Sequence, residues 1–225
     1  MKGWRRGAAT LAACLLLAEL LLPMIWGHFI LAKVPGASDD SEVVLSGRPA
    51  LAWLSGTIPR IEMNIPQLQG EKLALRQVHG VFSDVHLSLK QLVNGRLESL
   101  TAGQVDVTAT IGEEELVRLL SRPEKGIKEV SVTITPDLVL VQGTFSPGGL
   151  LKLRLSLEGQ LILQDQVIVL QTKKLMINNS DASGLIWSAL GKIPVMDGKQ
   201  LPFALRPTSV VQEDGQARVL LHAGR

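Results

Sequence analysis

Apolar and polar residues alternate along much of the chain, and this pattern predicts strands. In the clearest stretch, 151–157, every second residue is leucine and the residues between are charged or carry a hydroxyl. The same period of two occurs in 105–111, in 130–134 and in 81–90, where it places Phe82 on the polar face. Strands with one apolar and one polar face are typical of antiparallel sheets. We therefore expect a mainly β domain built on an antiparallel sheet.

Two further stretches are apolar at every position. They are 138–141 and 167–170, and each is expected to be a strand that is central or covered on both faces. Turn sequences stand at Pro136-Asp137 and at 146–149. The pattern therefore predicts a meander of about four strands over 127–171.

Two helices stand out inside the domain. Thr110 and Glu113 have the spacing of a capping box, and the leucines that follow in 116–120 share one helical face. The second helix is predicted over 180–190, where apolar residues gather on one side. The stretch 24–34 indicates a third helix, which would be the first element of the domain.

The first 22 residues have the pattern of an export segment. Lysine and arginine precede an apolar run from Gly7 to Leu22, and Pro23 interrupts it. In such a segment the Lys and Arg residues keep the N-terminus in the cytoplasm, and the apolar run enters the bilayer. Since no clean A-x-A cleavage site follows, an uncleaved signal-anchor is favoured over a cleaved signal peptide, which would leave the protein secreted. We expect a membrane segment at 1–22 and a domain at 23–225 on the extracytoplasmic side of the cell membrane.

Charge and composition restrict the partners. The chain has 23 Lys and Arg against 21 Asp and Glu, and beyond the first 22 residues there are 20 of each sign. Tyr is absent and there are only four Trp and four Phe, so neither a basic surface nor a set of stacking platforms for bases is indicated. The only cysteine, Cys14, lies in the export segment, which excludes an internal disulfide. We expect no nucleic-acid partner.

The sequence offers little that is typical of catalysis. It contains no G-x-S-x-G, P-loop or G-x-G-x-x-G motif. None of its four histidines has another histidine or a cysteine at ligand spacing. The acidic run 113–115 is explained by a helix start, where carboxylates favourably oppose the helix dipole. Asn178-Asn179-Ser180 matches the glycosylation pattern, which is common by chance. We therefore expect no enzyme activity, no cofactor and no metal site.

The apolar stripes need something to pack on. One solution is a second sheet, which gives a sandwich. Another is a curved sheet around a helix, with an apolar groove that holds lipid tails by burial. Physical reasoning from the residues leaves both open.

Three segments together resemble the LmeA-like phospholipid-binding family. The first is Leu22-Pro23, which leads through a short helix to 42–56, with a strand, a proline, a small apolar helix and a glycine, followed by a strand over 58–65. The second is the amphipathic helix 113–120 that leads into the meander. The third is Leu201-Pro202-Phe203, followed by the turn 213–215 and a last strand over 217–222. The order and spacing of the three segments carry the resemblance.

The resemblance implies an α+β, mainly β fold related to tubular lipid-binding domains. In such a fold a long bent antiparallel sheet wraps around one or two helices and leaves a tunnel for acyl chains. It also implies phospholipid binding in the bacterial cell envelope and supplies no catalytic residue. Under this hypothesis the lipid-binding residues lie mainly in the meander: Val130, Val132, Ile134, Leu151, Leu153, Leu155, Leu157 and Phe203.

The leading hypothesis is therefore non-enzymatic binding or transfer of phospholipid at the membrane. The alternative is a structural or assembly protein of the envelope, with a packed interior and a protein partner that the sequence does not identify. If 24–34 is the first helix of the domain, the tether is short, and a lipid groove would lie against the bilayer.

Overall fold

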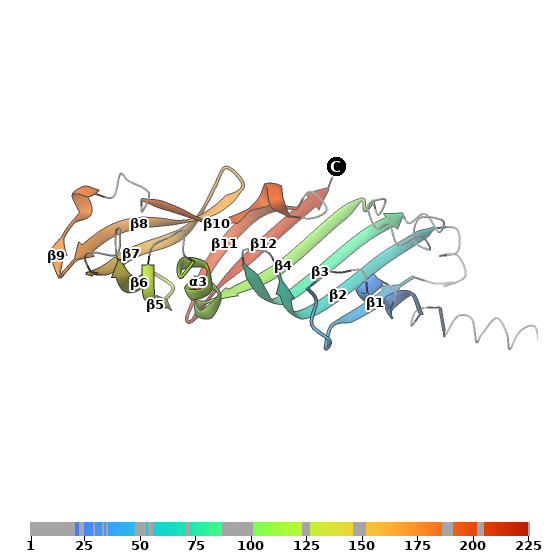
Figure 1. Ribbon diagram of the computed structural model, residues 1–225. Coiled ribbons are helices and arrows are strands. Elements are labelled where there is room, and N and C mark those ends of the chain that lie inside the picture. The colour runs from blue at the N-terminus through green and yellow to red at the C-terminus, as the bar shows by residue number, and fades with distance from the viewer. Residues whose placement is uncertain are drawn as a thin grey trace, which may run out of the picture.

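The protein is an elongated, mainly β molecule in which two sheets lie end to end (Figure 1). The computed structural model describes residues 21–22, 25–28, 30–32, 34, 36–47, 53, 56–70, 73–86, 101–122, 127–145, 152–185, 191–201 and 205–224. The buried apolar residues of both sheets belong to one continuous core. The expectation of a mainly β fold with antiparallel pairing is confirmed.

The first sheet, sheet A, has the strand order β1-β2-β3-β4-β12-β11, and all its pairs are antiparallel. Its strands come from both ends of the domain, because β12 pairs with β4 and so places the C-terminal hairpin beside the N-terminal strands. The bounds are β1 Glu42–Ser46, β2 Thr57–Gln69, β3 Ala74–His86, β4 Gln104–Gly112, β11 Arg206–Glu213 and β12 Gln216–Gly224.

The second sheet, sheet B, has the order β10-β8-β7-β6-β5, with the short β9 paired to β8. Four of these strands follow one another as a meander, as the turn sequences predicted. The bounds are β5 Ile127–Ile134, β6 Val139–Phe145, β7 Leu153–Gln164, β8 Val167–Ile177, β9 Ser180–Asp181 and β10 Lys192–Asp197.

The two all-apolar stretches have different environments. In β8, Ile168, Val169 and Leu170 are all buried, because β8 lies between β7 and β10, and a central position is confirmed. Strand β6 also has a neighbour on each side, β5 and β7, so residues 139–141 of the stretch 138–141 lie inside the sheet as well. This stretch is not covered on both faces, however: Val139 and Val141 are buried, whereas Leu138 is 36% exposed. Leu138 lies in the turn before β6, where solvent reaches it.

The expected single long sheet is replaced by two sheets. Helix α3 (Glu113–Leu120) follows β4 directly and lies between the sheets (Figure 1), so the chain leaves sheet A there and starts sheet B at β5. At the junction a side chain supplies hydrogen bonds. Gln212 Oε1 accepts from Leu161 N (2.6 Å), and Gln212 Nε2 donates to Thr135 O (3.0 Å).

Helix α3 forms as predicted, but it starts differently. Thr110 is a buried residue of β4 and Gly112 is the N-cap, so the capping box expected from Thr110 and Glu113 is wrong. Instead, Gly112 N donates to Glu115 Oε2 (3.1 Å), and Ile134 N donates to Glu113 Oε1 (2.8 Å). The acidic first turn thus pairs the N-cap amide of α3 and an amide at the end of β5, and its charge opposes the helix dipole.

Strand β3 does not keep the expected face. Phe82 is buried and Val81 is half-buried, the reverse of the assignment made by strict alternation. The reason is Asp84, whose positive φ of 52° breaks the period of two, so that Phe82 and Val85 both reach the core. Gln77, at φ 48°, does the same for Leu75 and Val78.

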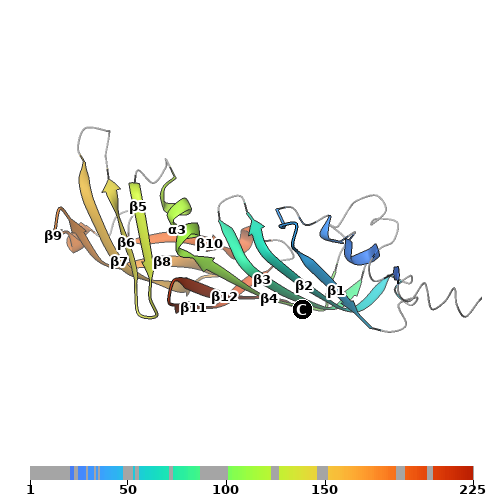
Figure 2. The same cartoon turned by 90° about the horizontal axis from the view of Figure 1, so that it is seen from below.

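The stretch after Pro23 is helical at its described positions 25–28 and 30–31. Trp26 and Ile30, one turn apart, are buried in the core, whereas Ile25 is exposed. Figure 2 shows this helix and α3 on the same side of the strands. The first helix of the domain is therefore confirmed over the described residues.

The structure describes only some of the residues of the remaining predicted helices. Of the helix predicted over 180–190, the structure shows the two-residue strand β9 and a 3₁₀ turn at Ser183–Leu185, and 186–190 lie outside the described residues. The export segment over 1–20 also lies outside them. Within the described ranges, no helix combines the length and the apolar character that a membrane crossing requires.

Candidate functional site

The predicted lipid-binding stripes form part of the packed core of sheet B. Val132, Ile134, Leu155 and Leu157 are at most 7% exposed, and α3 packs against the strand that carries the first two. Val130, in the middle of β5, and Leu153, the first residue of β7, are half-buried. Leu151 and Phe203 lie outside the described residues.

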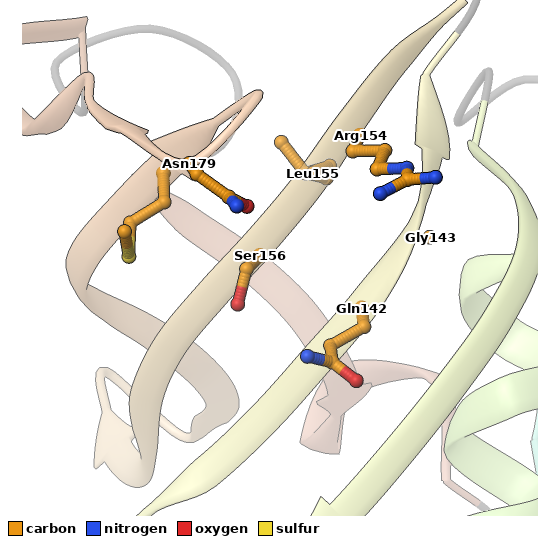
Figure 3. A pocket seen from close by; sticks show the side chains of 7 residues that line it. Gln142, Gly143, Arg154, Leu155, Ser156 and Asn179 are labelled. Atoms are coloured by element: carbon orange, nitrogen blue, oxygen red, sulfur yellow. The ribbon is translucent and has the colours of Figure 1, made fainter.

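The opposite, polar face of β6 and β7 carries a hollow, to whose lining the core residue Leu155 also contributes. Its volume is about 470 Å³, and Figure 3 shows the side chains around it. The lining residues come from β6, β7 and the end of β8: Gln142, Gly143, Arg154, Leu155, Ser156, Met176 and Asn179. We refer to it as the sheet B hollow.

Strand register explains why these polar side chains meet. Ser156 is directly opposite Gln142 on one side and Met176 on the other, so the three share one face. Arg154 is two residues before Ser156 and therefore projects from the same face. In Figure 3 the Arg154 side chain extends toward Gly143 of the neighbouring strand.

A tight turn completes the rim. Asn178 and Asn179, between β8 and β9, both have positive φ (50° and 63°), which asparagine tolerates better than most residues. The turn is fixed to β7 because Arg154 N donates to Asn178 Oδ1 and Asn178 N donates to Arg154 O, each at 2.9 Å. The result places Asn179 at the hollow, so this sequence serves as a hairpin turn in the structure.

The carboxylates near the hollow have partners of their own. Thr144 Oγ1 donates to Glu129 Oε2 (2.9 Å), and Glu158 lies 3.9 Å from Lys174 Nζ. Hydrogen bonds from the side chain and then the backbone of Ser183 hold the pKa of Asp181 below its usual value. Within the described part of the chain, Arg154 has no ion pair, whereas Arg60, Arg76 and Arg218 each face a glutamate.

A second polar group lies on the outer face of sheet A. His222 Nδ1 and Asp106 Oδ1 are 2.7 Å apart on paired strands, and Gln104 Nε2 donates to Asp106 Oδ2 (2.7 Å). Both members of the pair are about half exposed, so solvent screens their interaction. Among the described residues, no group of three or more His, Cys, Asp or Glu is arranged to hold a metal ion.

Sequence reasoning did not select the hollow. The polar half of the 151–157 alternation contains its signal, but alternation alone predicts only a solvated face. The sequence does not reveal that Ser156 pairs with Gln142 and Met176, because the register between strands is a tertiary property.

The described part of the molecule is thus a two-sheet, mainly β domain with one continuous apolar core and a polar hollow on one outer face. The model of the LmeA-like phospholipid-binding family matches residues 30–222, nearly the whole domain, and the chain belongs to this family. The resemblance drawn from the three sequence segments is confirmed. Comparison with curated proteins and with solved structures gave no match. The family suggests that the protein binds lipid.

Proposed function

We propose that the protein binds phospholipid outside the cytoplasm, held at the cell membrane by its first 22 residues, and passes it on within the bacterial envelope without catalysing a reaction. The observation that carries this proposal is the family match over 30–222. The export pattern of 1–22 supports the location, because basic residues precede an apolar run.

The binding mechanism we infer is burial of acyl chains. Each methylene removed from water contributes about 0.8 kcal/mol, so chains can be held without polar chemistry. The apolar side chains needed for this are present as one continuous layer, to which both sheets, α3 and the N-terminal helix contribute. Two sheets that share one core with helices on one side also support a relation to tubular lipid-binding domains.

Native mass spectrometry tests the proposal. The full-length protein, extracted from its membrane, should carry phospholipid, and the delipidated protein should take up added phospholipid. A protein that is extracted lipid-free and also refuses added phospholipid contradicts the proposal. Protease treatment tests the location. In a cell with two membranes, added protease should digest the domain in spheroplasts but not in intact cells. In a cell with one membrane and a thick wall, it should digest the domain in protoplasts.

One observation favours a second candidate, a structural or assembly protein of the envelope. The stripe residues Ile134, Leu155 and Leu157 are at most 3% exposed, as in a permanently packed interior. This candidate predicts a protein partner that can be crosslinked and that survives detergent, with no lipid in the purified protein.

A further inference from the structure

We propose that the sheet B hollow binds the phosphate group of a phospholipid headgroup, an inference that rests on the proposed phospholipid function and assigns one part of it. The argument starts from the donors at the hollow. Arg154 brings a guanidinium, Gln142 and Asn179 bring amides, and Ser156 brings a hydroxyl. A phosphodiester offers only acceptors, and a guanidinium binds two of its oxygens side by side.

These donors are not used inside the described part of the protein. The side chains of Arg154, Gln142, Ser156 and Asn179 make no hydrogen bond or ion pair there, whereas the backbone N and O of Arg154 both bond to Asn178 and Ser156 belongs to the β6–β7 ladder. The nearby carboxylates are not paired with Arg154: Glu129 accepts a hydrogen bond from Thr144, and Glu158 lies 3.9 Å from Lys174 Nζ. The guanidinium is therefore free to meet a ligand anion.

Size and lining match a headgroup. A volume of about 470 Å³ is at the lower end of the range for small-molecule pockets. That accommodates a glycerophosphate and its substituent but not two acyl chains. Met176 adds a flexible apolar wall against which the glycerol carbons can lie. Asp181 is directly opposite Met176 on β9, so it lies beyond this wall and is engaged by Ser183.

The position of the hollow changes the expected geometry of binding. Strand β9 and its turn lie at one end of the molecule, and the N-terminal helix lies at the other (Figure 1). A headgroup in the hollow is then held at the end of the domain remote from the tether. This differs from the expectation that a lipid groove lies against the anchoring bilayer, and it suits presentation of the lipid to a second surface.

The test compares three probes on the full-length, delipidated protein: dioleoyl phosphatidylglycerol, dioleoylglycerol without phosphate, and water-soluble glycerophosphoglycerol. Arg154→Gln should weaken phosphatidylglycerol binding at least about tenfold, which is 1.4 kcal/mol, and leave dioleoylglycerol binding unchanged. The matched control is Arg206→Gln, at an exposed arginine of β11, which should bind like the wild type. Ser156→Phe, which fills the hollow from an outward-facing position, should reproduce the effect of Arg154→Gln.

The outcomes separate this proposal from the proposed function. If Arg154→Gln binds phosphatidylglycerol as tightly as the wild type, or loses both lipids equally, the headgroup site is wrong and phospholipid binding stands. If the wild type binds neither lipid, the proposed function fails. The anion site is then tested separately, by adding glycerophosphoglycerol and following the NMR signals of the Asn179 and Gln142 side-chain amides. Shifts in the wild type that disappear in Arg154→Gln support an anion site, and their absence overturns it.

Discussion

At the scale of single residues, the stability of the fold depends on a few buried polar contacts. Glu115 is the clearest case, because its side chain is 2% exposed inside an otherwise apolar layer. Its carboxylate accepts from Gly112 N at 3.1 Å, and Arg76 Nη1 lies 3.9 Å away. Buried carboxylates persist only where such partners offset the loss of water.

We predict that Glu115→Ala lowers the free energy of unfolding by about 1–3 kcal/mol, since it leaves the Gly112 amide unpaired and removes apolar contacts of the stem. Urea denaturation measures the change. Glu114→Ala, at the exposed neighbouring position of the same helix turn, is the control and should change stability little. Equal effects of the two substitutions would contradict the role given to Glu115.

A second prediction at this scale concerns pH. The hydrogen bond with His222, and then that from Gln104, hold the pKa of Asp106 below its usual value. Folding therefore favours the ionised carboxylate, and this contribution is complete above the usual pKa and is lost as pH falls through the lowered pKa. Because both groups are exposed, we expect only about 0.2–1 kcal/mol.

Stability measured against pH tests this. Asp106→Asn should flatten the acid side of the profile relative to the wild type, with little change in its slope near neutral pH. Asp137→Asn, in an exposed turn of sheet B, is the matched control and should keep the wild-type profile. A profile that Asp106→Asn leaves unchanged on the acid side contradicts the contribution.

At the scale of elements, the junction of the two sheets is made by a side chain instead of a strand ladder. Gln212 on β11 bonds to Leu161 of β7 and to Thr135 after β5, so one amide connects three segments. A backbone contact adds to it, since Gly215 N in the turn after β11 donates to Ile134 O at 2.9 Å. Loss of this amide should loosen the two sheets at their junction.

We predict that Gln212→Leu lowers the free energy of unfolding by about 1–3 kcal/mol, because the buried Leu161 amide and the Thr135 carbonyl lose their partner. Hydrogen exchange should show faster exchange at Leu161 in particular. Gln67→Ala, at an exposed site of β2, serves as the control. Unchanged exchange at Leu161 in the Gln212 variant would show that the junction does not depend on this side chain.

At the scale of the whole molecule, the continuous core determines how a lipid would affect the domain. Both sheets, α3 and the N-terminal helix contribute to one apolar cluster. A ligand that binds only the folded state stabilises all of it, by about 2.7 kcal/mol when its concentration is 100 times Kd.

We therefore predict that phospholipid raises the Tm of the delipidated protein in a concentration-dependent manner. Leu157→Trp, at a fully buried position of β7, should cost about 1–3 kcal/mol by overpacking if the interior is closed. If acyl chains enter beside Leu157, the same substitution should instead reduce the lipid-dependent rise in Tm. A Tm that is independent of phospholipid contradicts lipid binding.

Much of the fold was predictable from the local pattern. The four-strand meander, α3 and the helix that carries Trp26 and Ile30 follow from periods of two and 3.6 with turn sequences between them. Strict alternation failed where the backbone leaves the regular strand, as at Asp84. No local signal marks such a bulge, because a positive φ there is imposed by pairing with neighbouring strands.

The sequence by itself determined most of the secondary structure, the apolar face of most strands and, through three ordered segments, the family. These are local or linear properties, set by side chains a few positions apart. Only the tertiary structure decided that the strands divide into two sheets, that β12 closes beside β4, and that Arg154 and Asn179 meet at one hollow. Those outcomes depend on register between residues far apart in the chain, and a register is chosen by the packing of the whole core.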